Sequence, residues 1–313
     1  AAANKVQVEI EPQSPILTIQ DGIKAGAFLY GPHRIERGDV DQVFKTAAHV
    51  IDHDVFSPGQ DHFYLESQAA LVVPEEDGTY LVHSSTQHPT EIQHVVSATL
   101  GISDSRVVCK VPRLGGGFGG KESQASPYAA YAAIVAHKTG RPCKVWLHRH
   151  QDMGWTGNRH PFWSTYRAAF DDQGMLLAID AKLYSDGGWS LDLSGPVMDR
   201  ALFHVDSSYY VPAIRIEGRV VKTNTPSNTA FRGFGGPQGV VVVEDAINRV
   251  AEKMGVDATD IRRRNLYGPS PRDTTHYGQV VADNHLPVLV PKLIASSDYA
   301  KGKIEIDDFN AKS

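Results

Sequence analysis

Glycine-rich segments occur at two places in this 313-residue sequence, and both contain Gly-Phe-Gly-Gly, at residues 117–120 and 233–236. Around the first copy, Gly115–Gly120 has glycine at every position except Phe118. Glycine tolerates positive φ and lets a backbone come close to another group. A glycine loop that opens a helix also directs unpaired N–H groups toward one point, where the helix dipole favours negative charge. Two such loops predict one large anionic ligand, such as a phosphorylated one, held from two sides.

The first loop matches two nucleotide-binding patterns only in part. From residue 115 it has the Gly-x-Gly-x-x-Gly spacing of the dinucleotide fingerprint, but no acidic residue stands about 20 residues further on, within Arg141–His148, to bind a ribose. It also comes close to a P-loop, yet Glu122 follows Lys121 where a Ser or Thr would bind magnesium. A carboxylate beside nucleotide phosphates is repulsive, so both nucleotide interpretations are disfavoured.

Composition and charge exclude several classes of protein. The chain is 41% hydrophobic and 21% charged with a net charge of −5, so it lacks the basic stripe of a nucleic-acid-binding protein. No apolar run reaches the roughly 18 residues that cross a membrane, and the length allows one or two domains. Cys109 and Cys143 form no metal motif and fit free thiols in a reducing cytoplasm. His148-x-His150 does not complete a three-ligand zinc site.

The elements that would position the two loops can be read from the hydrophobic periodicity. Strands at Arg106–Val111 and Ile214–Val221 lead into the loops, and helices at Ser126–Lys138 and Gly239–Met254 follow them, each stopped by a glycine. Further predicted elements are strands at Val6–Ile10, Ala69–Val73 and Thr79–Ser84, a helix at Thr90–Leu100 and a loop at Ser185–Pro196. Strands and helices mix without a repeating βαβ unit, which predicts an α+β fold.

Longer motifs extend this pattern over most of the chain. They are GGGFGGKE from residue 115, TNTPSNTAFRGFGGPQG from 223, GNRHPF from 157, RALFH from 200, QDHFYLE from 60 and RRRNLY from 262. In their order along the chain, these motifs resemble the molybdenum-cofactor subunit of xanthine dehydrogenase, in the molybdenum hydroxylase family. One departure is His148-Arg149-His150, where relatives tend to be more acidic. The resemblance implies a molybdenum-cofactor-binding fold of the xanthine dehydrogenase/aldehyde oxidase type, incomplete in this chain.

The resemblance also implies which residues contact the cofactor. Gln87 would lie beside the molybdenum, and the two loops would contribute Gly117, Phe118, Gly119, Arg232, Gly233 and Gly235. The metal would be held through the pterin, near Gln87, Phe118 and Arg232. The structural alternative for Gln87 is an amide that satisfies nearby backbone groups.

Three further residues resemble the purine site of the family. Glu122 and Arg200 would bind a purine from opposite sides and act in catalysis, and Phe234 would pack on its ring. An arginine suits an oxygen that gains negative charge in the transition state. The structural alternatives are an ion pair between Arg200 and Asp199, a helix N-terminal charge for Glu122 and a core anchor for Phe234.

The activity implied by the resemblance is molybdenum-dependent hydroxylation of purines, from hypoxanthine and xanthine to urate. Residues 1–25 would be the tail of a preceding hammerhead-like domain, and 26–313 the first part of the molybdopterin-binding region. The chain would be inactive alone and would need the remaining molybdopterin-domain polypeptide. [2Fe–2S] clusters and FAD would sit on partner chains or domains, with NAD as acceptor, in a cytoplasmic dimer of the assembled unit. An aldehyde oxidase or another N-heterocycle hydroxylase is the alternative within the family, and a non-catalytic carrier of the pterin cofactor is the alternative outside it.

Overall fold

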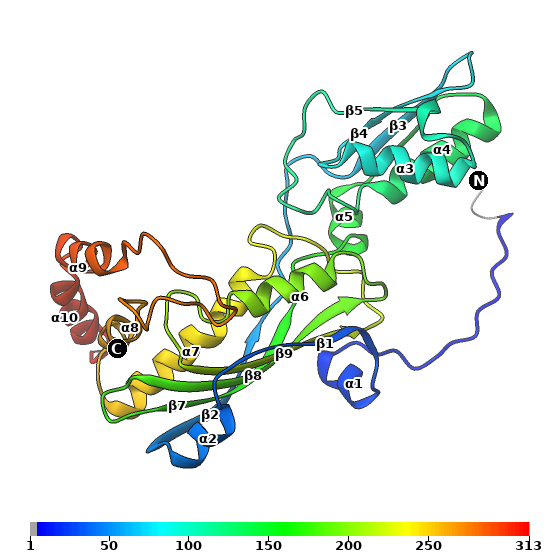
Figure 1. Ribbon diagram of the computed structural model, residues 1–313. Coiled ribbons are helices and arrows are strands. Elements are labelled where there is room, and N and C mark those ends of the chain that lie inside the picture. The colour runs from blue at the N-terminus through cyan, green and yellow to red at the C-terminus, as the bar shows by residue number, and fades with distance from the viewer. Residues whose placement is uncertain (1–4, 313) are drawn as a thin grey trace.

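A computed structural model describes residues 5–312 and contains two separate β-sheets (Figure 1). The larger has the strand order β1-β9-β8-β7-β2, and the smaller has the order β5-β4-β3-β6. The strands are β1 (Phe28–Arg37), β2 (His49–Ser57), β3 (Ala69–Pro74), β4 (Tyr80–Ser84), β5 (Val107–Lys110), β6 (Cys143–Trp146), β7 (Phe162–Phe170), β8 (Leu176–Gly188) and β9 (Ala213–Lys222). The helices are α1 (Ile19–Lys24), α2 (Val40–Thr46), α3 (Pro89–Leu100), α4 (Ser126–Thr139), α5 (Arg149–Trp155), α6 (Ser194–Phe203), α7 (Gly236–Met254), α8 (Ala258–Asn265), α9 (Leu286–Ser296) and α10 (Tyr299–Asn310).

The smaller sheet carries α3 and α4 side by side on one face (Figure 1). Helix α3 connects β4 to β5, which pair in parallel, whereas β3 is antiparallel to both of its neighbours. The buried face of α4 consists largely of alanines, whose small side chains let the helix lie close to the sheet. Gly140, in the left-handed conformation, ends this helix.

The larger sheet is covered on both faces. Successive residues of a strand point to opposite faces, and accordingly Ile179 belongs to the core beneath α6 and α7, while its neighbour Ala178 packs with Val40 of α2. Helix α7 begins at the left-handed Gly235, has Pro237 in its first turn and ends at the left-handed Gly255. These end signals explain why this helix was readable from the sequence.

The α+β prediction is confirmed, because both sheets are mainly antiparallel with one parallel crossover each. The strand expected at Val6–Ile10 is wrong, since this segment is exposed and pairs with no strand of the described residues. Part of the loop expected at Ser185–Pro196 is also wrong, because β8 continues to Gly188 and α6 starts at Ser194. Within residues 5–312, no helix is both long enough and apolar enough to cross a bilayer.

Candidate functional site between two glycine turns

The two Gly-Phe-Gly-Gly segments fold into the same tight turn. Phe118 and Phe234 have φ values of 53° and 50°, and the glycines that follow them, Gly119 and Gly235, have φ values of 101° and 95°. In both copies the fourth residue donates its N–H to the carbonyl of the first, at 2.8 and 2.9 Å. Positive φ at both central residues is the signature of a type I′ turn. Phenylalanine rarely adopts this conformation, and such strained residues cluster at functional sites.

The two turns pack against each other through their backbones. The N–H of Arg232 donates to the carbonyl oxygen of Phe118 at 2.9 Å. A Cβ atom on Gly119 would lie 2.7 Å from the carbonyl oxygen of Ala230, closer than side chains can approach. Gly235 likewise leaves room for the carbonyl of Val197 in α6. The glycines are therefore required for the contact between the turns and with α6.

Only the second turn opens a helix directly. Gly235 is the N-cap of α7, whereas α4 begins at Ser126, several residues beyond the first turn. The prediction that both loops direct a helix N-terminus at one ligand is therefore wrong for the first loop. The unpaired N–H groups available there come from the turn itself.

A cavity of about 430 Å³ lies between the turns. It is lined by Gln87, Phe118, Gly119, Glu122, Ala230, Phe231, Arg232, Gly233 and Phe234. Most of the residues predicted for the cofactor and the substrate thus meet around one space. Gly117 and Gly235 are not part of this lining, and a Cβ on Gly117 would lie 2.5 Å from Oε1 of Gln87. Both glycines are needed for the shape of the wall.

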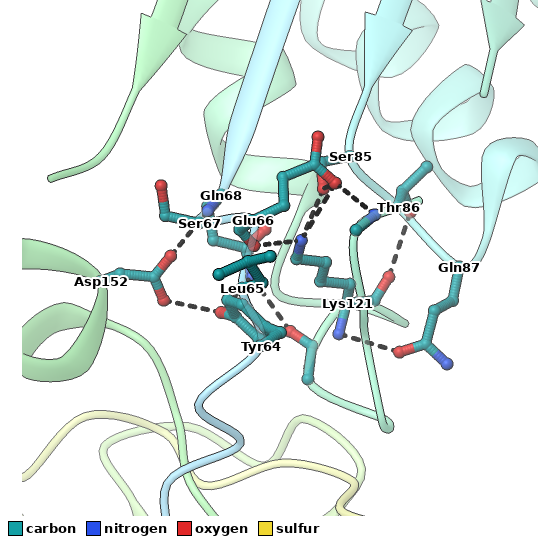
Figure 2. A network of polar contacts seen from close by, with 12 residues as sticks. Tyr64, Leu65, Glu66, Ser67, Gln68, Ser85, Thr86, Gln87, Lys121 and Asp152 are labelled. Atoms are coloured by element: carbon teal, nitrogen blue, oxygen red, sulfur yellow. Dashed lines mark hydrogen bonds and ion pairs between the residues drawn. The ribbon is translucent and has the colours of Figure 1, made fainter. Parts of the chain in front are cut away.

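The amide of Gln87 is held by the first glycine loop (Figure 2). Oε1 of Gln87 accepts hydrogen bonds from the main-chain N–H groups of Gly119 at 2.8 Å and Lys121 at 3.3 Å. The main-chain N–H of Gln87 donates to the carbonyl of Lys121 at 2.8 Å. The oxygen therefore satisfies nearby backbone, as the structural alternative predicted. The NH₂ group has no hydrogen-bond partner within residues 5–312 and remains available to a ligand.

Other donors on the cavity wall are also unpaired. Among the described residues, the main-chain N–H groups of Phe118 and Gly233 donate to nothing, and the exposed Arg232 side chain makes no ion pair. Phe118, Gly233 and Arg232 are exposed residues, so these donors are accessible to a ligand in the cavity. This set of donors fits an oxygen-rich, anionic group such as the oxo ligands and phosphate of a molybdenum–pterin cofactor.

Glu122 lines the cavity, and its half-buried side chain has no hydrogen-bond partner in the described part of the chain. Burial raises the pKa of the Glu122 carboxyl above its ordinary value; the charge of His88 opposes this shift and that of Asp192 adds to it. The alternative of a helix N-terminal charge does not hold, because the first turn of α4 contains no acidic residue.

The structure does not bring Arg200 into the cavity wall. Arg200 is exposed in the last turn of α6. The expected alternative, an ion pair with Asp199, is absent from the described residues, because the Asp199 carboxylate contacts the Tyr30 hydroxyl at 2.9 Å and His33 Nδ1 at 2.8 Å. Phe234 lines the cavity and also packs on the larger core, so its two interpretations are compatible.

Two residues that brace the turns were missed as site residues. His62 places Nε2 2.7 Å from the carbonyl oxygen of Ala230, and its ring lies 4.7 Å from that of Phe231. Arg159 donates to the carbonyl of Arg232 at 2.8 Å and lies 4.0 Å from the Phe231 ring centroid. Their signal in the sequence was their place within the QDHFYLE and GNRHPF motifs.

Comparison with known sequences identifies relatives along the whole chain. Residues 24–266 match the family described as the molybdopterin cofactor-binding domain. The chain is 42% identical to xanthine dehydrogenase/oxidase of Mus musculus over all of its length, and 40% identical to xanthine dehydrogenase of Emericella nidulans over 98% of its length. It spans 23% and 22% of these two relatives.

Solved structures share the fold. The aldehyde oxidoreductase from Desulfovibrio gigas superposes with a TM-score of 0.85 at 27% identity, over 96% of this chain and 34% of that one. Quinoline 2-oxidoreductase from Pseudomonas putida 86 gives a TM-score of 0.86 at 23% identity, over 99% of this chain and 41% of that one, and shows the fold alone.

Proposed function

Because the chain belongs to the molybdopterin cofactor-binding domain family, we propose that it supplies one wall of a molybdenum–molybdopterin site in a hydroxylase that acts on purines. The observation that carries the proposal is the cavity between the two type I′ turns, which gathers Gln87, Glu122 and Phe234 around unpaired donors. The relatives of the chain are xanthine dehydrogenases, of which it covers about a quarter, so the activity belongs to the longer assembly.

Four donors would hold the cofactor: the Gln87 NH₂ group, the N–H groups of Phe118 and Gly233, and the Arg232 guanidinium. When bound, a molybdenum–pterin group supplies a redox-active metal that accepts electrons from the substrate. The chain itself binds and orients the group, because fixed donors need no reorganisation when charge changes at the ligand.

Three residues would act on the substrate. Glu122, left unpaired and half-buried, would accept a hydrogen bond from a ring N–H or hold a proton for the heterocycle. Phe234 would pack on the ring, as its place on the cavity wall allows. Although Arg200 is not part of the cavity wall, it would bind the oxygen that gains charge, and its lack of an ion pair with Asp199 leaves its guanidinium available.

The likeness to aldehyde oxidoreductase makes an aldehyde or another N-heterocycle the main alternative substrate. Glu122 favours the purine, because an unpaired carboxyl in the wall matches a substrate that offers ring N–H groups. A carrier of the pterin cofactor would need the two turns but would have no use for Glu122, Arg200 and Phe234. The proposal includes [2Fe–2S] clusters, FAD and NAD on other chains or domains, a dimeric assembly and a cytoplasmic location.

The test is metal analysis and an absorbance spectrum of the full-length native protein, followed by turnover of xanthine and of an aromatic aldehyde. We expect molybdenum together with flavin and iron–sulfur bands, and faster turnover of xanthine. Molybdenum without turnover of either substrate would favour the carrier, and preference for the aldehyde would favour the aldehyde oxidase. A protein without molybdenum would refute the proposal.

A further inference from the structure

The ammonium group of Lys121 is buried beneath the first glycine turn, and the side chain of this residue is 0% exposed. Nζ donates to the carbonyl oxygen of Glu66 and to Oγ of Ser85, both at 2.6 Å (Figure 2). The Glu66 carboxylate lies 3.7 Å away, and the Tyr64 ring centroid lies 4.3 Å away. Lys121 thus fixes the end of the first glycine loop to the segment that precedes β3.

Glu66 fixes the beginning of the same loop. Its Oε2 accepts from the N–H of Gly115 at 2.7 Å and from Ser85 Oγ at 2.8 Å, and its own N–H donates to the carbonyl of Gly115 at 3.1 Å. Burial alone would raise the pKa of Glu66, but the hydrogen bonds from Gly115 and Ser85 and the charge of Lys121 outweigh it and lower this pKa. The charged pair therefore closes the loop from both ends.

The loop closed in this way orients Gln87. The N–H of Lys121 donates to Oε1 of Gln87, and the carbonyl of Lys121 accepts from the N–H of Gln87 at 2.8 Å and from Thr86 Oγ1 at 3.1 Å. Because the amide oxygen is taken by the loop, the NH₂ end is the one left for the cavity. Neither Lys121 nor Glu66 lines that cavity.

We infer that Glu66 and Lys121 are positioning residues, which clamp the first glycine loop and thereby set the orientation of the Gln87 amide toward the cofactor. The Lys121 side chain is fully buried, whereas that of Glu66 is 41% exposed. A partly exposed ion pair contributes only about 0–1 kcal/mol to stability, so stability alone does not explain this pair. The clamp itself follows from the contacts, and its effect on the cofactor rests on the proposed function.

Hydrogen–deuterium exchange of the full-length protein tests the clamp without any assay of activity. In Lys121→Met and in Glu66→Gln, we expect peptides covering residues 115–121 to exchange faster than in the wild type, because the N–H groups of Gly119 and Lys121 lose their fixed acceptor. The matched control is Glu244→Gln, which breaks the 2.7 Å ion pair with Arg262 between α7 and α8. The near-isosteric variant Glu66→Gln decides the matter. If residues 115–121 exchange at the same rate in this variant as in the wild type, the inference is wrong.

Molybdenum content tests the connection to the cofactor. Mutation of residues that hold metal-site ligands in place typically lowers metal affinity about 10–100-fold. We expect a loss of molybdenum affinity in this range for Lys121→Met and no loss for Glu244→Gln. If Lys121 acts through Gln87, then Lys121→Met should cost little more in a Gln87→Ala background. Full additivity of the two losses would mean a merely structural role for Lys121. A wild-type protein without molybdenum would refute the proposed function, while the exchange experiment would still decide the clamp.

Discussion

The N–H of Arg232 donates a 2.9 Å hydrogen bond to the carbonyl oxygen of Phe118, and this contact joins two turns from distant parts of the chain. One turn follows the smaller sheet and the other opens α7 above the larger sheet. Since both turns need positive φ at a phenylalanine, their strain must be offset by contacts with each other and with their neighbours. The repeated tetrapeptide thus forms two similar turns that contact each other through their backbones.

Replacing Gly119 by Ala should destabilise the fold more than replacing Gly140 by Ala. Both glycines have positive φ, but a Cβ on Gly119 would meet the Ala230 carbonyl at 2.7 Å, whereas nothing lies within 4 Å of a Cβ on Gly140. We expect about 1 kcal/mol for Gly140→Ala from backbone strain and about 1–3 kcal/mol more for Gly119→Ala from overpacking. Urea unfolding of both variants measures the difference, and equal losses would contradict the close contact of the turns.

Replacing Arg200 by Met should reduce the turnover of xanthine far more than its binding. Loss of one donor to a developing oxyanion typically costs on the order of 10²–10³ in kcat. An aromatic aldehyde places no charge at the distant oxygen, so its oxidation should change little. The measurement is kcat and KM for both substrates at matched molybdenum occupancy, with Arg263→Met as the exposed control. Equal effects on the two substrates, or none on either, would exclude Arg200 from the purine site.

Replacing Glu122 by Gln should remove a pH dependence in purine turnover. Because burial raises the pKa of the Glu122 carboxyl, the wild type should lose kcat/KM as the pH falls through this raised pKa and the carboxylate takes up a proton. The amide cannot titrate, so the variant should be slower but lack this acidic limb. Glu75→Gln, at an exposed hairpin, is the control. An acidic limb that persists unchanged in Glu122→Gln would assign it to another group.

The buried His160 should make the fold sensitive to acid. Burial lowers the pKa of its imidazole from 6.5 to about 3, with a smaller contribution from Arg159. Between these two values the unfolded chain binds a proton that the folded chain does not, so stability is fully present above pH 6.5 and is lost as the pH falls toward 3.

Unfolding free energies measured between pH 7 and pH 4 test this, and His160→Gln should show a shallower loss than the wild type. The substitution keeps a polar side chain near Ser194, which lies 2.7 Å from Nε2 of His160. The exposed His285→Gln serves as the control and should follow the wild type. A slope unaffected by His160→Gln would place the acid sensitivity elsewhere.

Local signals explain which parts of the fold could be predicted. Helix α7 combines a glycine start, a proline in the first turn and a glycine end, so its existence and type were readable. The segment Val6–Ile10 has the alternation of a strand, but a strand also needs a partner, and partners are a tertiary property that one sequence does not display. Helix α10 has no buried residue, and its sequence lacks clear end signals, so it was missed.

The candidate site was predictable as a set of residue types and only partly as a geometry. The repeated tetrapeptide indicated two similar loops, and most of the residues assigned to them line one cavity. The braces His62 and Arg159 act on backbone carbonyls across the chain, contacts that no spacing within the sequence reports. The same holds for the pairing of Lys121 with Glu66, which only the folded loop brings together.

The two largest apolar cores belong to different sheets, and this bears on the cooperativity of unfolding. One core lies under α6 and α7 and the other under α3 and α4, and the segments between them meet through polar and backbone contacts around the cavity. Regions with few buried apolar contacts open first in native proteins. A ligand bound in the cavity contacts both halves and adds its binding free energy to both at once. We therefore expect a ligand in the cavity to couple the unfolding of the two halves.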